Sequence, residues 1–162
     1  MNRVDKTNYY LNIAEAVSGR CTCRRKWYGA IIVQNDEVIA SGYVGAPRAR
    51  VNCLDLDACV REKLNIPRGE RFELCRSVHA EANAIISASR RDMIGAAMYL
   101  ACRQPGTDTL IPGTTSCSMC KRLIINAGIA RVVVRDTPEA YRVIEVEDWI
   151  RDDESLEGKF GY

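Results

Sequence analysis

The chain has 162 residues, of which 47% are hydrophobic and 27% are charged, and its formal net charge is +2. This length supports one sizeable hydrophobic core, so we expect a single domain over residues 1–162. The nearly balanced charge argues against a strongly basic nucleic-acid surface or a polybasic membrane anchor, and no apolar run approaches the roughly 20 residues that cross a bilayer.

The first half of the chain predicts one helix and a hairpin. Apolar residues recur at helical spacing over 9–17, and two β-rich runs, 29–33 and 38–43, flank a polar turn. Residues 46–76 carry three cysteines, two prolines and many charges without a clean period. We interpret them as a Cys-rich insertion with one helical turn near Val60–Lys63, and so long a loop implies a function or a staple.

In the second half, helical and strand patterns alternate. The predicted elements are a helix over 78–90, a strand over 98–102, a loop over 103–116, a helix over 117–127, strands over 129–135 and 141–146, and an acidic C-terminal tail over 147–162. This order predicts a three-layer α/β sandwich.

Eight cysteines accompany a single histidine, His79. The cysteines would suit a disulfide scaffold in a small secreted protein, but the polar residues Met1–Asp5 are not followed by an apolar signal core. We therefore expect a cytoplasmic protein with reduced thiols, in which metal binding is the favoured role for some cysteines.

Two short motifs point to a catalytic zinc site. His79 lies two residues before Glu81, and Cys117 and Cys120 form a CxxC pair. Each motif falls in the first turn of a predicted helix, so three ligands would converge from two helix N-termini, whose dipoles favour thiolates. One imidazole and two thiolates leave the fourth position of zinc open, where a water would be acidified toward a pKa of about 7. Glu81 could then carry protons without binding the metal.

A bland interpretation exists for each motif taken alone. An HxE on a helix can be a surface accident, and a CxxC can be a structural knuckle or a redox pair. Together and in this order they match the HxE…PCxxC signature of zinc deaminases, with Ser116 in place of the proline. Serine at this position can still cap the helix.

Several strings beyond these motifs resemble the deoxycytidylate (dCMP) deaminase branch of the cytidine deaminase superfamily. The resemblance runs from Cys23 to Val134, and its most specific strings are HAEANAI and CSMCKRLIINAGI; CRR, GA, GYVGAPR and CRSV also match. It implies an αβα sandwich around a five-stranded mixed sheet, and a homo-oligomer that is often a hexamer. The implied reaction is dCMP plus water to dUMP plus ammonia.

The resemblance also implies substrate contacts. The backbone amide of Ala80 would help to hold the pyrimidine carbonyl. The family's usual GYNG has an asparagine that binds the sugar hydroxyl, whereas this chain has Val44, which cannot make that bond. Either another group binds the sugar or the substrate differs from plain dCMP. For the 5′-phosphate, Arg25 is the first candidate, with Arg24 and Lys26 beside it.

Arg48, after the GYVGAP turn, is a further phosphate candidate, although each of these cations could equally be ordinary surface charge. In this branch a second, structural zinc commonly ties the long connection to the core, and the resemblance assigns it to four cysteines: Cys23, Cys53, Cys59 and Cys75. Cys21 could replace Cys23. The branch often binds dCTP or dTTP with Mg²⁺ near the GYNG turn, but Val44 leaves that regulation unsupported here.

Two other functions share these motifs. A tRNA-editing deaminase has HAE and CxxC, although the near-neutral charge and the Cys-rich insertion argue against it. A non-catalytic zinc protein of the same fold would not need Glu81 beside an open metal position. A free nucleotide deaminase is therefore the leading hypothesis.

Overall fold

A five-stranded sheet forms the centre of the protein. The computed structural model describes residues 1–159, and its strands are β1 (Trp27–Gln34), β2 (Glu37–Tyr43), β3 (Ala97–Arg103), β4 (Arg131–Arg135) and β5 (Tyr141–Glu145). Their order across the sheet is β2-β1-β3-β4-β5. The β3–β4 pair is parallel and the other pairs are antiparallel, so the predicted mixed sheet is confirmed.

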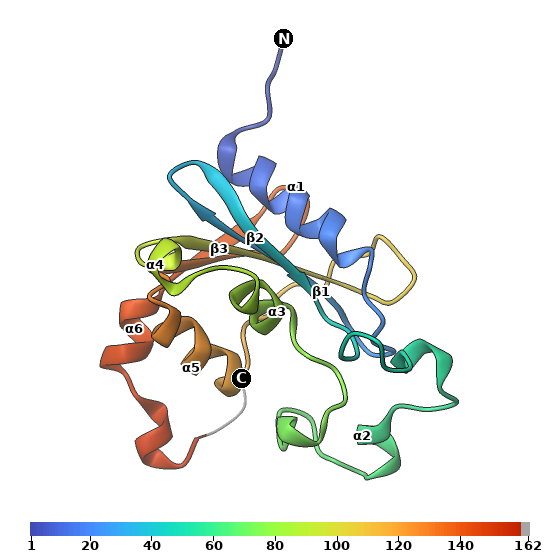
Figure 1. Cartoon of the computed structure of the whole chain (residues 1–162). Helices are drawn as coiled ribbons and strands as arrows, with labels where there is room; N and C mark the ends of the chain where they lie inside the picture. Colours follow the sequence, from blue (N-terminus) through green and yellow to red (C-terminus); the bar gives the residue numbers. More distant parts are fainter. Residues whose placement is uncertain (160–162) are drawn as a thin grey trace.

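Helices cover both faces of this sheet, as Figure 1 shows. The helical segments are α1 (Lys6–Ser18), η1 (Cys53–Asp55), α2 (Val60–Lys63), η2 (Phe72–Leu74), α3 (Ala80–Ile86), α4 (Arg90–Met93), α5 (Ser118–Ala127), α6 (Val146–Arg151) and η3 (Glu154–Glu157). Helix α1 packs on one face, while α3, α5 and α6 lie on the other (Figure 1). This is the predicted three-layer sandwich.

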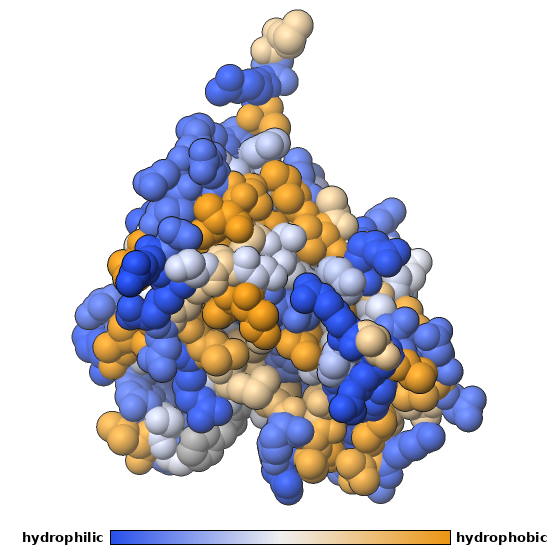
Figure 2. Space-filling model, in the orientation of Figure 1, coloured by the Kyte–Doolittle hydropathy of each residue, from blue (hydrophilic) through white to orange (hydrophobic). Residues whose placement is uncertain are grey.

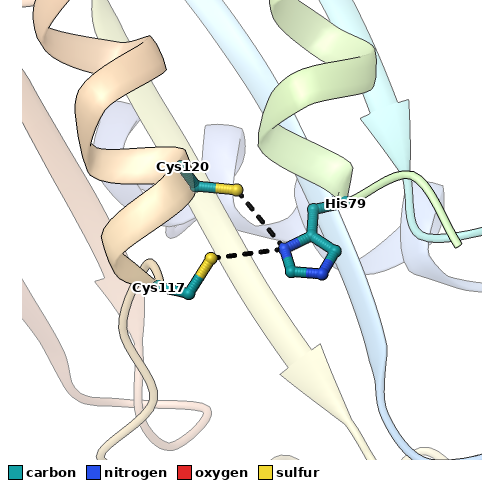
Figure 3. A group of neighbouring side chains, drawn as sticks. All are labelled: His79, Cys117 and Cys120. Carbon is teal, nitrogen blue, oxygen red and sulfur yellow. Dashed lines mark hydrogen bonds between the residues drawn. The ribbon is translucent and has the colours of Figure 1, made fainter. Parts of the chain in front are cut away.

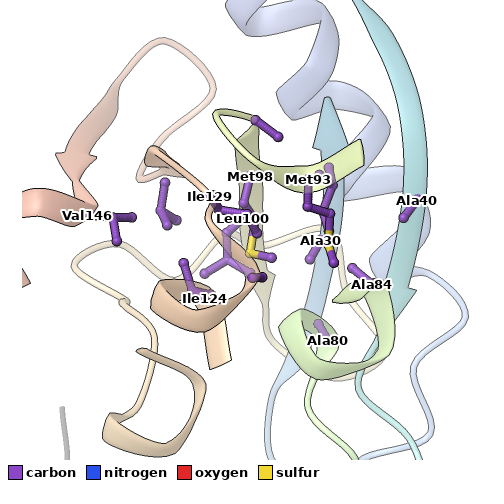
Figure 4. Close-up of a cluster of buried hydrophobic side chains, with 14 of the residues drawn as sticks. Ala30, Ala40, Ala80, Ala84, Met93, Met98, Leu100, Ile124, Ile129 and Val146 are labelled. Carbon is purple, nitrogen blue, oxygen red and sulfur yellow. The ribbon is translucent and has the colours of Figure 1, made fainter. Parts of the chain in front are cut away.

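Alternation along β1 explains how one strand serves both layers. Ala30 and Ile32 belong to the buried cluster beneath α3 and α5, which Figure 4 shows, whereas Ile31 and Val33 belong to the cluster beneath α1. Successive side chains of a strand point to opposite faces, so a continuous apolar run fills two cores. Both cores fix the position of β1, against which the functional helix α3 packs.

The predicted helix over 78–90 is shorter than expected and broken. Helix α3 ends at Ile86, and the Ser87 hydroxyl donates a hydrogen bond to the carbonyl of Asn83. The separate turn α4 begins after Ser89, whose side chain accepts a hydrogen bond from the Arg91 amide. Serines that bond to nearby backbone groups favour such helix ends over helix interiors.

Gly42 on β2 allows α3 to approach the sheet closely. A Cβ at this position would lie 2.3 Å from the Ala84 amide nitrogen and 2.4 Å from the Ala80 carbonyl oxygen. Because both atoms are backbone, Gly42→Ala must displace α3, and we expect the free energy of unfolding to fall by about 2 kcal/mol or more. Urea denaturation measures this change. The neighbouring exposed Ser41→Ala is the control, and equal stability of the two variants would refute the close-packing argument.

The two irregular segments have local structure of their own. The Cys-rich insertion, residues 46–76, contains η1, α2 and η2, and α2 coincides with the helical turn predicted at Val60–Lys63. The C-terminal tail forms α6 and η3, while residues 160–162 lie outside the described residues. Within residues 1–159, no helix combines the length and apolar character that crossing a membrane requires.

The surface on the side drawn in Figure 1 has a hydrophobic middle. Figure 2 shows apolar residues gathered there and ringed by hydrophilic ones. Several large apolar side chains on the helical layer are exposed, among them Ile86, Ile94 and Leu123.

Candidate metal centre and its cavity

Three potential metal ligands converge between the starts of α3 and α5. His79 is the N-cap residue of α3, Cys117 is the N-cap residue of α5, and Cys120 lies in the first turn of α5. The sulfur atoms of both cysteines lie 3.4 Å from Nδ1 of His79, as Figure 3 shows. Two helix N-termini thus direct one nitrogen and two sulfurs at a common point.

The spacing of these atoms fits a tetrahedral zinc ion. Zinc bonds of about 2.3 Å to sulfur and about 2.0 Å to nitrogen separate the two ligand atoms by ~3.5 Å. The observed nitrogen–sulfur distances of 3.4 Å agree with this value. Within the described part of the chain, no other set of three His, Cys, Asp or Glu side chains brings its ligand atoms within 4.8 Å of one another.

The environment of the cluster favours a bound cation. Cys117 and Cys120 are buried, and a hydrogen bond from the Cys120 thiol lowers the pKa of Cys117 well below its usual range. This shift favours the thiolate form of Cys117, which is the form that binds metals, while the pKa of its partner Cys120 is raised by the same interaction. The start of α5 adds the positive end of a helix dipole beside it.

Glu81 lies beside this cluster and is nearly inaccessible to solvent. Only 4% of the residue is exposed, and it lines the same cavity as His79 and Cys117. Burial raises the pKa of its carboxyl, although the nearby His79 opposes that shift. A carboxyl group with a raised pKa can both accept and return a proton near neutral pH.

Ser116 does not cap α5, contrary to the prediction. Cys117 occupies the N-cap position without a side-chain capping bond, so the helix begins one residue later than expected. The Ser116 side chain is instead fully buried and interacts with the Glu81 carboxyl, whose burial-raised pKa it lowers.

The cavity has a volume of about 230 Å³ and is open to solvent. Of the predicted substrate contacts, Ala80, Val44 and Arg25 line it. Ser116 and Arg48 are not among its lining residues, and Arg48 is exposed. The structure therefore gathers three of the five predicted contacts around the metal cluster.

The four cysteines assigned to a second zinc are not gathered as ligands. Cys23 and Cys75 line the cavity, Cys53 lies 3.5 Å from the Ser77 hydroxyl, and Cys59 is the N-cap residue of α2. Among the described residues, no three of these sulfurs reach the 4.8 Å spacing that the catalytic group shows. The second zinc stays a prediction.

Sequence reasoning missed the part of the cavity wall that the insertion supplies. Arg61, Arg68 and Phe72 line the cavity, and so does the half-buried Tyr28 of β1, which also packs against the core. The insertion has no period from which to infer which of its residues face inward. The one sequence signal that could have pointed to these residues is the number of arginine and lysine residues in 61–71, which is compatible with an anionic ligand.

Comparison with known proteins agrees with the zinc-deaminase geometry of the site. The family model for the cytidine and deoxycytidylate deaminase zinc-binding region matches residues 4–136. The deoxycytidylate deaminase of Mycobacterium phage D29 is 36% identical over 138 residues, covering 82% of this chain and 96% of that protein. The deoxycytidylate deaminase of Saccharomyces cerevisiae is 31% identical over 138 residues, covering 85% of this chain but only 39% of the yeast protein.

Solved structures share the fold. The dCMP deaminase of cyanophage S-TIM5 superposes with a TM-score of 0.57 at 23% identity, over 83% of this chain and 85% of that one. The cytidine deaminase of Burkholderia pseudomallei also gives a TM-score of 0.57, at 18% identity, over 89% of this chain and 95% of that one.

Proposed function

This chain belongs to the cytidine and deoxycytidylate deaminase family, and we propose that it hydrolyses dCMP to dUMP and ammonia with a catalytic zinc. The observation that carries the proposal is the convergence of His79, Cys117 and Cys120 beside the buried Glu81. The 36% identity to a phage deoxycytidylate deaminase supports dCMP as the substrate.

In the proposed mechanism His79, Cys117 and Cys120 would hold the zinc, which supplies the acidity that makes water nucleophilic at neutral pH. Glu81 takes one proton from the attacking water and delivers it to the ring nitrogen beside the attacked carbon. The carbon–oxygen bond forms as this nitrogen is protonated. Glu81 then transfers the second water proton to the amino group, whose bond to carbon breaks to release ammonia.

The backbone amide of Ala80 would bind the pyrimidine, and the side chain of Val44 would face the sugar. Ala80 is the first residue of α3, so its amide has no partner within the helix and can donate to the pyrimidine carbonyl. Val44 lines the cavity with an apolar surface and offers the sugar hydroxyl no hydrogen bond. Another group must therefore bind that hydroxyl, or the sugar of the preferred substrate differs from deoxyribose.

Four arginine and lysine side chains line the cavity. Arg61 is engaged with loop carbonyls, and the other three would bind the 5′-phosphate. They are Arg25, Lys26 and Arg68, and burial lowers the pKa of Lys26, with the charges of Arg68 and Arg25 adding to the effect. The Arg25 guanidinium forms a long ion pair, 3.6 Å, with the exposed carboxylate of Glu62. Like charges that repel one another in a cavity are stabilised when an anion binds between them.

Arg25→Met and Lys26→Met are each expected to raise KM for dCMP about tenfold or more, because a hydrogen bond to a charged group contributes roughly 1.5 to 3 kcal/mol. Turnover of deoxycytidine, which lacks the phosphate, should change little. Steady-state kinetics on both substrates measures the contrast. Arg48→Met, at an exposed position outside the cavity, is the matched control, and an equal loss in all three variants would argue against this phosphate site.

Ammonia release tests the function itself. The zinc-loaded protein is assayed in parallel on dCMP, CMP, deoxycytidine and a structured tRNA. The proposal expects dCMP to have the highest kcat/KM. Deamination of the tRNA alone would support an editing enzyme, and inactivity on every substrate despite bound zinc would support a non-catalytic zinc protein.

The same proposal includes three features of the working protein. A homo-oligomer, with a hexamer as the common form in the branch it resembles, is supported by the exposed Ile86, Ile94 and Leu123 on the helical layer. A structural zinc on Cys23, Cys53, Cys59 and Cys75 is kept as an expectation. A cytoplasmic location would keep the thiols of the metal cluster reduced.

A further inference from the structure

The end of the Cys-rich insertion packs against the histidine of the metal cluster. The Phe72 ring in η2 meets the His79 ring edge to face, with the ring centres 5.5 Å apart and the planes at 87°. Nδ1 of His79 lies 3.4 Å from the sulfurs of Cys117 and Cys120, and the imidazole also has a hydrogen bond with the Cys75 side chain. Phe72 therefore bears directly on how the imidazole is rotated.

Arg61 holds Phe72 in place. This arginine is only 4% exposed, and its guanidinium donates hydrogen bonds to three carbonyl oxygens of the following loop, those of Pro67, Glu70 and Arg71, at 3.1, 2.5 and 2.6 Å. The same guanidinium lies over the Phe72 ring, 5.2 Å from its centre. One buried cation thus closes the loop and contacts the ring that touches His79.

We propose that Arg61 and Phe72 are positioning residues that hold the His79 imidazole with Nδ1 facing the metal. A histidine ligand has rotational freedom about its Cβ–Cγ bond, and proteins usually remove that freedom with groups that contact the ring from outside the ligand set. Here the insertion supplies that support. The inference rests on the proposed metal site, and it gives the insertion a role that does not depend on a second zinc.

Arg61 contacts Phe72, and Phe72 contacts His79, so both residues are required to hold the imidazole. Without the Phe72 ring, the imidazole loses its edge-to-face partner and can turn Nδ1 away from the two sulfurs. Without the Arg61 fork, the carbonyls of 67–71 lose their shared donor and the ring loses its cation, so Phe72 can move. Lysine carries the same charge but cannot donate in the geometry of a planar fork.

Binding of Co²⁺, measured without substrate by the absorption of the cobalt–thiolate complex, tests this inference. The signal that disappears in Cys117→Ser identifies the His79 site. Phe72→Leu is expected to weaken Co²⁺ binding at this site about tenfold, the usual effect of removing an outer contact of a metal ligand. Phe72→Tyr, which keeps the ring, should bind as the wild type does, and Arg61→Lys should weaken binding in the same direction.

Arg24→Met is the matched control. Arg24 also donates to carbonyls of the insertion, those of Leu54 and Leu56 at 3.4 and 2.5 Å, but it is not among the residues that line the cavity. Wild-type affinity in Phe72→Leu, or equal weakening in Arg24→Met, would overturn the proposal. If the wild type binds Co²⁺ at this site yet does not deaminate dCMP, the proposed function fails while the affinity differences still test the positioning role.

Discussion

Glu81→Gln is expected to reduce kcat for dCMP by about 10³-fold or more. General acid–base catalysis typically contributes about 10²- to 10⁴-fold, and Glu81 would serve as both acid and base. Glutamine has nearly the same shape as glutamate but can neither accept the proton of the attacking water nor return it to the substrate. Ammonia release under substrate saturation measures the change.

The zinc content of Glu81→Gln shows whether its activity is lost because the proton carrier is missing or because the metal site is damaged. Because Glu81 is not one of the three converging ligands, zinc content in Glu81→Gln should equal that of the wild type. Glu37→Gln, at an exposed position on β2, is the control for the same chemical change. If Glu81→Gln kept more than a tenth of wild-type kcat with zinc bound, another group would have to carry the protons.

Removing the metal is expected to abolish deamination and lower the thermal midpoint of unfolding. Chelation leaves the buried Cys117 sulfur without a cation beside it. A metal that binds only the native state stabilises that state by an amount that rises with the ratio of free metal to Kd. Adding Zn²⁺ should restore both activity and midpoint. Calorimetry and ammonia release on the same samples measure the two effects.

The number of zinc ions bound by cysteine variants shows which metal site is responsible for the lost activity. With a structural site, the wild type is expected to bind two zinc ions per chain. Cys117→Ser should then lose one zinc and all activity. Cys53→Ser should lose the other zinc. One zinc per chain, unchanged in Cys53→Ser, would remove the second site. Full activity of the chelated protein would contradict a catalytic metal altogether.

The metal cluster could be predicted from sequence because its residues sit at fixed distances from helix starts. His79 and Cys117 prove to be N-cap residues and not first-turn residues, but this difference of one position leaves them facing the same point. The five strands were also predictable, because apolar runs such as 29–33 carry the pattern themselves.

Contacts between distant segments could not be predicted in this way. Arg135 is 1% exposed and pairs with Glu15 on α1 at 2.8 Å, yet nothing near either residue distinguishes it from a surface charge. The inward direction of Arg61, Arg68 and Phe72 likewise depends on how the aperiodic insertion folds back on His79. Local periodicity contains no information about such contacts.

Anomalous diffraction at the zinc edge from crystals of the zinc-loaded protein tests the central claim most directly. The expected result is a zinc atom bonded to Nδ1 of His79 and to the sulfurs of Cys117 and Cys120, with a water as fourth ligand within hydrogen-bond reach of Glu81. A fourth ligand from the protein, or no zinc between these three side chains, would contradict the catalytic assignment.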